Sequence, residues 1–448
     1  MKINLPEKVN KILGVLTDNG FEAYVVGGCV RDSLLGIAPK DWDICTDATP
    51  DEIKECFASF YTYDAGIKHG TVSVVLEKEV FEVTTYRIDG EYKDNRHPKS
   101  VIFTDNLTAD LARRDLTINA MAYNEPSGLQ DPFNGRVDLK NRLIRCVGSP
   151  DKRFNEDALR IIRALRFASV YDFSIDKETS DSVLKNAQLL HNISSERISS
   201  ELNRLLCGDG AEEVLNNYRE VFAVFIPEIK RSFDFEQHTK HHNRDVWRHT
   251  THAVASISPT VMLRMTMLLH DLGKPRACKV DPDGTCHFKI HPKYSAEYAD
   301  EILHRLKYPS RFIDTCLKLI LYHDVRFNGT KRQVKHIMNA IGEENLSLLF
   351  KVQRADILAQ SDYLQKQKLE SIDTAEALYA EILKEASCFT LKQLAINGND
   401  LQKLGVPCGK EIGSLLKLLL SLVIDEKVKN EKSALLKKAE ELKEDIND

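Results

Sequence analysis

The chain has 448 residues, 42% of them hydrophobic and 29% charged, which is the composition of a globular protein with room for roughly three domains. Its formal net charge of −5 at pH 7 excludes a protein that is basic throughout, although a local basic surface stays compatible with it. No apolar run is long enough to cross a bilayer, the segment after Met1 lacks the apolar core of a signal peptide, and the ten cysteines include no C-x-x-C pair. We therefore expect a cytoplasmic protein with reduced thiols and no membrane partner.

The N-terminal part of the chain alternates helical with β-prone segments. A helix is predicted from Glu7 to Asn19, because a glycine follows it, and a second helix is predicted after Thr49, which has the side chain of an N-cap. Residues 23–26, 71–76 and 80–86 are rich in β-branched and aromatic residues and predict strands. The pattern favours a mixed α/β domain at this end of the chain.

Two glycines and two aspartates follow the first predicted strand. Gly27 and Gly28 permit a tight turn, at which Gly28 can offer backbone N–H groups to a phosphate and Arg31 can add a charge-assisted clamp. Asp41 and Asp43 lie two residues apart on the next predicted strand, so they point to the same side and favour a cation between them. Oxygen ligands suit Mg²⁺ in phosphoryl-transfer sites. The alternative for the acidic pair alone is a solvated Asp-x-Asp beside a simple turn.

Three later features each have two interpretations. Glu82 lies between apolar residues of a predicted strand, and it is either a third metal carboxylate or a solvent-facing residue. Residues 88–101 are rich in Gly, Asp and Lys, which predicts a mobile loop rather than an element, and such loops often position a nucleotide. Arg114 is either a triphosphate ligand tethered by Asp115 or part of a surface ion pair.

The segment from Arg153 to Ala168 is predicted to form a helix with one buried side. Asp157, Arg160 and Arg163 follow at steps of three and share a polar strip, from which Arg166 drifts away. One interpretation is an intrahelical ladder of salt bridges. The other is base selection, because a carboxylate paired with a guanidinium complements the amino donor and ring-nitrogen acceptor that cytosine and adenine share.

These motifs resemble those of the class II tRNA nucleotidyltransferases and bacterial poly(A) polymerases. The similarity is carried by GGCVRDSLLG from Gly27, DWD from Asp41, RRDLTINAMA from Arg113 and EDALR from Glu156. The resemblance implies addition of C, C and A to the 3′ end of tRNA from CTP and ATP, with the predicted loop at Asp89 to Pro98 favouring addition of the terminal A. It implies that Asp41 and Asp43 bind Mg²⁺, and that the incoming nucleotide is contacted by Gly28, Arg31, Arg114, Asp157, Arg160, Arg163 and Arg166.

Histidines concentrate in the third quarter of the chain, where eleven of the fourteen lie between His238 and His336. Imidazole and carboxylate together suit divalent metals, and the order of these residues resembles the HD phosphohydrolase domain. That resemblance implies a second divalent metal with possible hydrolase activity. Its implied ligands are His249, His270, Asp271 and Asp324, with His291 and His323 as further candidates.

The sequence as a whole predicts an α+β protein, with a mixed α/β nucleotidyltransferase head at residues 1–145 and mainly α-helical regions after it. These regions are a neck for nucleotide selection and RNA binding at 146–235, an HD domain at 236–342 and a tRNA-binding tail at 343–448. The alternatives to a complete CCA-adding enzyme are an A-adding tRNA nucleotidyltransferase, a poly(A) polymerase, and an RNA-binding HD phosphohydrolase whose head is inactive.

Overall fold

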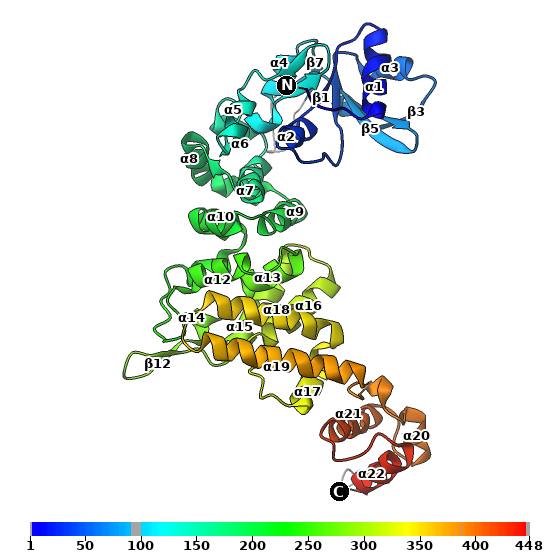
Figure 1. Ribbon diagram of the computed structural model, residues 1–448, viewed down its shortest axis with the longest axis vertical. Coiled ribbons are helices and arrows are strands. Elements are labelled where there is room, and N and C mark those ends of the chain that lie inside the picture. The colour runs from blue at the N-terminus through cyan, green and yellow to red at the C-terminus, as the bar shows by residue number, and fades with distance from the viewer. Residues whose placement is uncertain (1, 91–99, 386, 445–448) are drawn as a thin grey trace. The chain divides into compact units, whose positions relative to one another are not determined.

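The computed structural model describes residues 2–90, 100–385 and 387–444, and the chain divides into two compact units, Met1–Lys230 and Arg231–Asp448 (Figure 1). The first unit combines a β-sheet with helices, whereas the second is almost entirely helical. This arrangement confirms the predicted α+β fold class, with a mixed head followed by mainly helical regions.

The first unit is built on a seven-stranded sheet. Across the sheet the strands are β3 (Tyr61–Gly66), β4 (Thr71–Leu76), β5 (Glu79–Thr85), β2 (Ile44–Thr46), β1 (Ala23–Val26), β8 (Ala122–Asn124) and β9 (Gly128–Gln130). β2 and β5 run parallel, and every other neighbouring pair is antiparallel. In the parallel pair Ile44 lies opposite Val83, so the residues just before them, Asp43 and Glu82, are neighbours at one end of the sheet.

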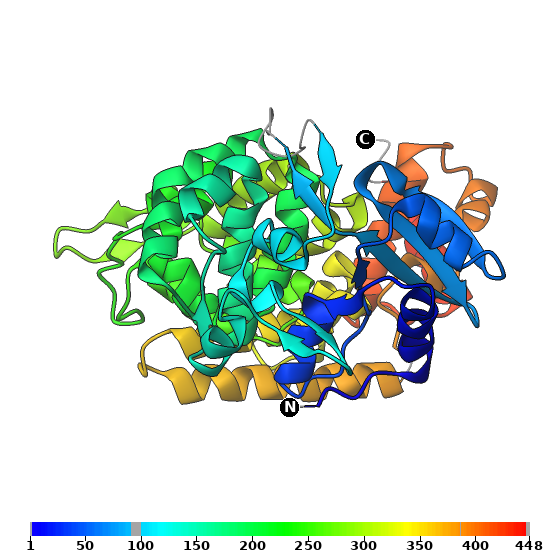
Figure 2. The same cartoon turned by 90° about the horizontal axis from the view of Figure 1, so that it is seen from above.

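Helices α1 (Glu7–Asp18) and α3 (Pro50–Cys56) pack together against this sheet, α1 on β1 and α3 on β4 and β5 (Figure 2). Thr49 and Glu52 form a capping box at the start of α3, in which each side chain accepts the backbone N–H of the other residue. Both helices were predicted from their punctuating residues, and both predictions are confirmed.

The predicted loop at residues 88–101 is shorter than expected at both ends. β6 (Arg87–Asp89) and β7 (Val101–Phe103) pair antiparallel, with Arg87 opposite Phe103. The β-branched residues Ile88 and Val101 therefore belong to strands at the two ends of the segment that its glycine and charged residues had marked as a loop. Residues 91–99, which hold most of the predicted nucleotide-positioning loop, lie outside the described residues.

Short helices complete the first unit. They are α2 (Gly28–Leu34), α4 (Leu107–Ala112), α5 (Gly135–Lys140), α6 (Pro150–Glu156), α7 (Leu159–Tyr171), α8 (Lys177–Asn186), α9 (Ser195–Leu206), α10 (Ala211–Asn217) and α11 (Arg219–Phe225), with β10 (Leu143–Ile144) and β11 (Ser174–Ile175) as a small parallel pair. The single helix predicted from Arg153 to Ala168 is wrong, because the backbone of Asp157 is extended between α6 and α7. Its carboxylate accepts the Leu159 N–H at 3.0 Å, so Asp157 stabilises the start of a new helix.

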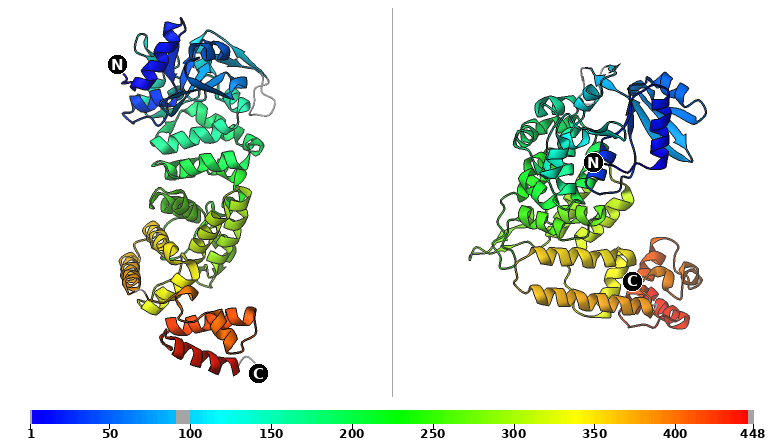
Figure 3. Two further views of the ribbon diagram at one scale, coloured as in Figure 1. Left: turned by 90° about the vertical axis from the view of Figure 1, so that its right-hand side faces the viewer. Right: turned by 45° about the horizontal axis from the view of Figure 1, so that its top comes forward.

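The second unit contains eleven α-helices among its described residues, in addition to a short hairpin of β12 (Lys279–Val280) and β13 (Cys286–His287). The helices are α12 (Val246–Ala255), α13 (Val261–Leu269), α14 (Lys274–Ala277), α15 (His291–Arg305), α16 (Ser310–Tyr322), α17 (Lys331–Ile341), α18 (Glu343–Ala359), α19 (Gln365–Lys384), α20 (Gly398–Lys403), α21 (Lys410–Ile424) and α22 (Lys432–Glu444). α18 and α19 lie side by side (Figure 3). Across the part of the chain that is described, no helix is both long and apolar enough to cross a membrane.

Candidate active site and metal centre

An acidic edge lies where β1, β2 and β5 meet. Asp41 and Asp43 come just before β2, and the Asp43 carbonyl accepts the Val26 N–H at 3.0 Å, which fixes this segment against the end of β1. Desolvation raises the pKa of Asp43, and the charges of Asp41 and Glu82 raise it further. A divalent cation would relieve this repulsion, so the donor set fits Mg²⁺. Glu82 is near enough to act on Asp43, while its role as a third ligand stays a prediction.

Arg114 lies against the glycine turn. Its Nη1 is 2.9 Å from the position that a Cβ on Gly27 would occupy, and Gly27 has φ +79°, so a larger residue here would be strained and would displace the guanidinium. Arg114 Nη2 pairs with Asp110 Oδ2 at 3.4 Å. The predicted tether by Asp115 is wrong, because Arg114 reaches back one helical turn to buried Asp110 while Asp115 faces α7.

Asp115 instead connects two other arginines of the predicted site. It accepts a hydrogen bond from Asn119 Nδ2 at 3.1 Å and pairs with Arg163 Nη2 at 2.6 Å. Asn119 Oδ1 in turn accepts a bond from Arg31 Nη1 at 2.5 Å. Burial alone would raise the pKa of Asp115, but Arg163 and Asn119 hold it well below its usual range. The chain of contacts therefore fixes Arg31 and Arg163 through one ionised carboxylate.

Aromatic rings of α7 support Arg31. Its guanidinium carbon lies 5.0 Å from the centre of the Phe167 ring and 5.2 Å from that of Tyr171. The Tyr171 hydroxyl donates to Asp32 Oδ1 at 2.9 Å, and Asp32 pairs with Arg31 Nη2 at 2.8 Å. Sequence reasoning assigned no role to Asn119, Phe167 or Tyr171. The spacing of four residues between Phe167 and Tyr171 places both rings on one side of α7, and this was the available signal for an aromatic surface.

The remaining predicted nucleotide contacts have separate partners. Asp157 Oδ2 pairs with Arg197 Nη2 of α9 at 3.2 Å, and Arg160 Nη1 pairs with Glu156 Oε2 at 3.0 Å. The predicted ladder from Asp157 to Arg160 is therefore wrong for this step among the described residues, because the break after α6 takes Asp157 out of the helix. Arg166 is buried and pairs with Glu201 of α9 at 3.1 Å, which braces α7 against α9, while its contact with the nucleotide stays a prediction.

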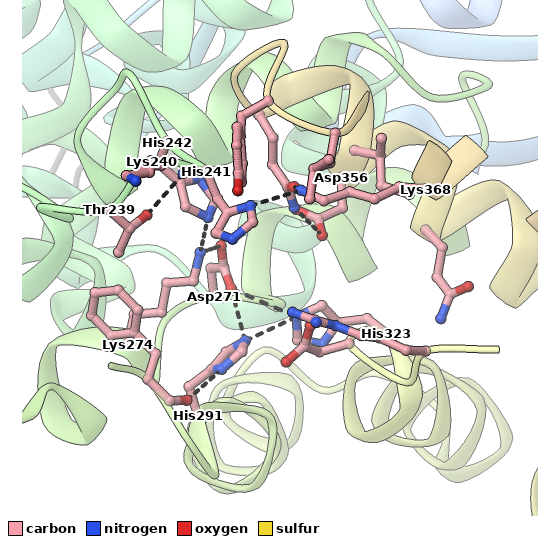
Figure 4. A pocket seen from close by; sticks show the side chains of 18 of the residues that line it. Thr239, Lys240, His241, His242, Asp271, Lys274, His291, His323, Asp356 and Lys368 are labelled. Carbon is pink, nitrogen blue, oxygen red and sulfur yellow. Dashed lines mark hydrogen bonds and ion pairs between the residues drawn. The ribbon is translucent and has the colours of Figure 1, made fainter. Parts of the chain in front are cut away.

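The second unit brings six potential metal ligands together from separate elements, and Figure 4 labels four of them, Asp271, His291, His323 and Asp356. One group consists of His249 from α12, His270 and Asp271 after α13, and Asp356 from α18, all buried and with ligand atoms within 4.8 Å of one another. His249 Nε2 lies 2.9 Å from Asp356 Oδ1 and 3.2 Å from Asp271 Oδ2. Burial alone would lower the pKa of His270, yet Asp271 and Asp356 raise it to about 10, so the group attracts positive charge.

A second group shares Asp271 with the first. Asp271 Oδ1 lies 3.2 Å from His291 Nε2 and 3.6 Å from His323 Nε2, while its Oδ2 faces His249 and His270. A carboxylate whose two oxygens face two sets of imidazoles is suited to bridge two metal ions. The structure therefore brings His291 and His323, the two less certain ligands, into the same cluster.

The four histidines are all oriented by the backbone. Each Nδ1 lies 2.7–3.2 Å from a carbonyl oxygen, and the accepting residues are Ala359 for His249, Met267 for His270, Phe288 for His291 and Ile320 for His323. A proton on Nδ1 leaves the lone pair on Nε2, and all four Nε2 atoms face the carboxylates. This second layer of contacts fits a metal centre. His270 Nε2, which is buried, makes no well-aligned hydrogen bond of its own.

Asp324 is the predicted ligand that the structure does not bring to either group. It is exposed at the wall of the same cavity, because α16 ends at Tyr322 and His323 alone turns inward. Asp356 takes the expected place, so the centre extends beyond residue 342, where the sequence predicts the end of this region. The available signal for Asp356 was its position one turn after Val352 on the buried strip of α18.

Three family models match the chain. They are the Poly A polymerase head domain at residues 23–145, the probable RNA- and SrmB-binding site of polymerase A at 172–233, and the putative tRNA nucleotidyltransferase domain 2 at 286–439. The CCA-adding enzyme of Ligilactobacillus salivarius strain UCC118 is 42% identical over 54% of this chain and 63% of its own length. That of Geobacillus thermodenitrificans strain NG80-2 is 50% identical over 46% of this chain and 50% of its own length. The chain thus spans half to just under two thirds of these curated relatives.

Solved structures extend the similarity over the whole chain. The Bacillus stearothermophilus CCA-adding enzyme in complex with CTP matches with a TM-score of 0.74 and 28% identity, covering 98% of each chain. The Thermotoga maritima CCA-adding enzyme complexed with tRNA shares the fold, with a TM-score of 0.57 at 20% identity. The sheet, its acidic edge and the matched head model define a nucleotidyltransferase head. In each of these comparisons the chain is similar to the tRNA nucleotidyltransferases and bacterial poly(A) polymerases.

Proposed function

We propose that this protein adds C, C and A to the 3′ end of tRNA, using CTP and ATP with Mg²⁺ and releasing pyrophosphate, in the cytoplasm. The single observation that carries the proposal is that one compact unit holds both the acidic edge, where the charge of Arg114 acts on Asp43, and the arginines held through Asp115 and Asn119. Similarity to CCA-adding enzymes supports the same activity. Residues 1–145, 146–235 and 343–448 would serve as head, neck and tRNA-binding tail.

Each group of residues has a distinct task in this proposal. Asp41 and Asp43 hold Mg²⁺, which supplies charge stabilisation for attack by the tRNA 3′-hydroxyl and for departure of pyrophosphate. Arg31 and Arg163 bind the triphosphate as guanidiniums whose orientation is fixed before the nucleotide arrives. Asp157, just before α7, and Arg160, in the first turn of α7, read the edge that cytosine and adenine share.

The test uses tRNA transcripts that end before CCA, after C and after CC, each given CTP and ATP separately and together with Mg²⁺. Addition of all three bases that stops at A is expected. Extension of only the CC-ended transcript would instead indicate an A-adding enzyme, and long A tails would indicate a poly(A) polymerase. The variant Asp41→Ala is expected to abolish transfer, and transfer at the wild-type rate would refute the proposed metal site.

We propose a second activity, metal-dependent hydrolysis of a phosphate ester, for the histidine cluster of the second unit. It is favoured by the two ligand groups that share Asp271 and by the common orientation of the four imidazoles. Divalent ions held by His249, His270, Asp271 and Asp356, and by Asp271, His291 and His323, would supply Lewis acidity and an activated water.

Metal analysis and hydrolysis assays test this second activity together. The purified protein is expected to retain a transition metal through gel filtration and to hydrolyse p-nitrophenyl phosphate or its bis ester only when loaded. A protein that binds no metal, or a loaded protein without hydrolysis, would limit the chain to nucleotide transfer.

A further inference from the structure

In the cavity over the histidine cluster, the charged residues outside the metal groups are mostly cations. The cavity has a volume of about 1080 Å³, and Asp271, His291, His323 and Asp356 form part of its lining. The charged residues that line it apart from the metal groups are Lys240, Lys274, Lys289, Arg326 and Lys368, against one acid, Asp324. A cavity with acidic metal ligands at its base and cations around it is complementary to an anion that also binds metal.

Two of these lysines differ in their partners. Lys274 Nζ lies 2.6 Å from Asp271 Oδ2, so the metal centre already neutralises its charge. Lys368, on α19, donates to Gln360 Oε1 at 2.6 Å and lies 3.1 Å from His241 Nδ1, and none of the ion pairs found among the described residues includes it. Lys368 is therefore a partly buried cation with only neutral hydrogen-bond partners.

Burial and neighbouring cations destabilise the charged form of Lys368. Burial lowers its pKa, and Arg326 and Lys274 lower it further, against the attraction of Asp356 and Asp324. Burial and the charge of Lys368 also lower the pKa of His241, which keeps that ring neutral. An anion at this position would supply the missing negative charge.

Lys368 is also connected to the metal centre. Gln360, which accepts from Lys368, donates through Nε2 to Asp356 Oδ2 at 2.9 Å. One side chain thus separates the ammonium from a metal-ligating carboxylate, and Figure 4 shows Lys368 on the same side of the cavity as Asp356. Tyr363, whose ring centre lies 5.0 Å from that of His241, continues the wall beside this position.

We infer that Lys368, with Arg326 beside it, is the phosphate-binding residue of this cavity and selects substrates that carry an anionic phosphate next to the metal centre. The inference rests on the hydrolase activity proposed above and names its substrate class. Lys368 supplies a charge-assisted hydrogen bond to a phosphate oxygen, while the metal ligands remain His249, His270, Asp271, His291, His323 and Asp356.

The experiment follows acylation of individual lysines in the full chain by peptide mass spectrometry, because a site-resolved measurement separates this cavity from phosphate binding at the head. Inorganic phosphate is expected to slow acylation of Lys368 several-fold, with and without added metal. Lys366 is the matched control, since it lies on the same helix with a side chain 93% exposed, and its acylation should not change. Equal acylation of Lys368 with and without phosphate would overturn the inference.

A pair of variants separates failure of this inference from failure of the hydrolase proposal. Lys368→Gln is expected to raise the KM for p-nitrophenyl phosphate about tenfold at unchanged metal content, Lys368→Arg to recover part of the loss, and Lys366→Gln to match the wild type. If Lys368→Gln hydrolyses p-nitrophenyl phosphate with a wild-type KM, the phosphate-binding role of Lys368 is refuted and the hydrolase proposal stands. Phosphate protection of Lys368 without any hydrolysis would refute the hydrolase and leave the phosphate site standing.

Discussion

The two sites of this chain place their charges in opposite ways. In the first unit, Asp115 fixes Arg163 directly and Arg31 through Asn119, and no histidine pairs with Asp41 or Asp43 among the ion pairs of the described residues. In the second unit, His249, His270 and Asp271 are at most 1% exposed, and the backbone sets the orientation of the rings. We therefore expect the first site to receive Mg²⁺ together with a substrate, and the second to retain metal by itself.

The largest expected effect comes from Asp43→Ala. Removal of this carboxylate should lower the rate of nucleotide addition by on the order of 10³-fold, because one ligand of the proposed Mg²⁺ is lost while the arginines stay in place. Single-turnover incorporation of labelled CTP measures the rate, and metal content of the second unit is the control. A loss of less than tenfold would contradict the assignment of Asp43 as a ligand of the Mg²⁺ used for transfer.

The next effect is that of Asp271→Asn on the second unit. Asp271 belongs to both ligand groups, so the metal content measured after gel filtration should fall at both positions. The metal affinity should fall by more than the roughly 10- to 100-fold that is typical when a residue contacting a metal ligand is replaced. Asp324→Asn is the matched control, since Asp324 lies outside both groups. Loss of metal in the Asp324 variant, or retention in the Asp271 variant, would contradict the assignment of ligands.

A smaller effect is expected for Asp115→Asn, which releases Arg163 and Asn119. The substitution should lower the free energy of unfolding by ~2 kcal/mol, less than the loss of a fully buried pair, because the Arg163 side chain is 32% exposed. This change should lower the Tm by several degrees at pH 7. The folded-state pKa of Asp115 is lowered, so its stabilisation is complete above about pH 4 and declines as the pH falls towards the folded-state value.

Thermal unfolding of both proteins between pH 7 and pH 3 checks this sign. The Tm difference between the wild type and Asp115→Asn should narrow as the pH falls below about 4. A difference that stays constant over this range would mean that the negative charge of Asp115 contributes no stability.

The smallest effect is that of Tyr171→Phe. The variant keeps the ring that packs on Arg31 and loses only the hydrogen bond to Asp32, so the KM for CTP should rise about two- to fivefold with kcat unchanged. Tyr171→Leu also removes the ring and should raise the KM further. Equal KM values for the two variants would show that the ring does not help to orient Arg31.

Local motifs made the first site predictable from the sequence. The glycine turn and the aspartate pair lie within one strand–turn–helix–strand segment, so their proximity follows from sequence order. The tether of Arg114 was assigned wrongly because adjacent residues at the end of a helix point in different directions, and the helical spacing of four to Asp110 decides the contact.

The second site was harder to predict because its ligands come from helices far apart in the sequence. His323 and Asp324 repeat the His-Asp order of His270 and Asp271, but Asp271 is buried whereas Asp324 is exposed. Asp356 is a single acid within a long helix, and no local pattern connects it with His249. Tertiary packing of α18 against α12 and α13 brings them together.

The extended backbone at Asp157 has a consequence for how accurately a base can be chosen. Arg197 pairs with its Oδ2 and the Leu159 N–H donates to its Oδ1, so the orientation of the carboxylate is set before a nucleotide arrives. If Asp157 reads the base, the geometry of its hydrogen bond to the base depends in part on Arg197. Fidelity at this position would then change with substitution of Arg197, a residue that need never touch the nucleotide.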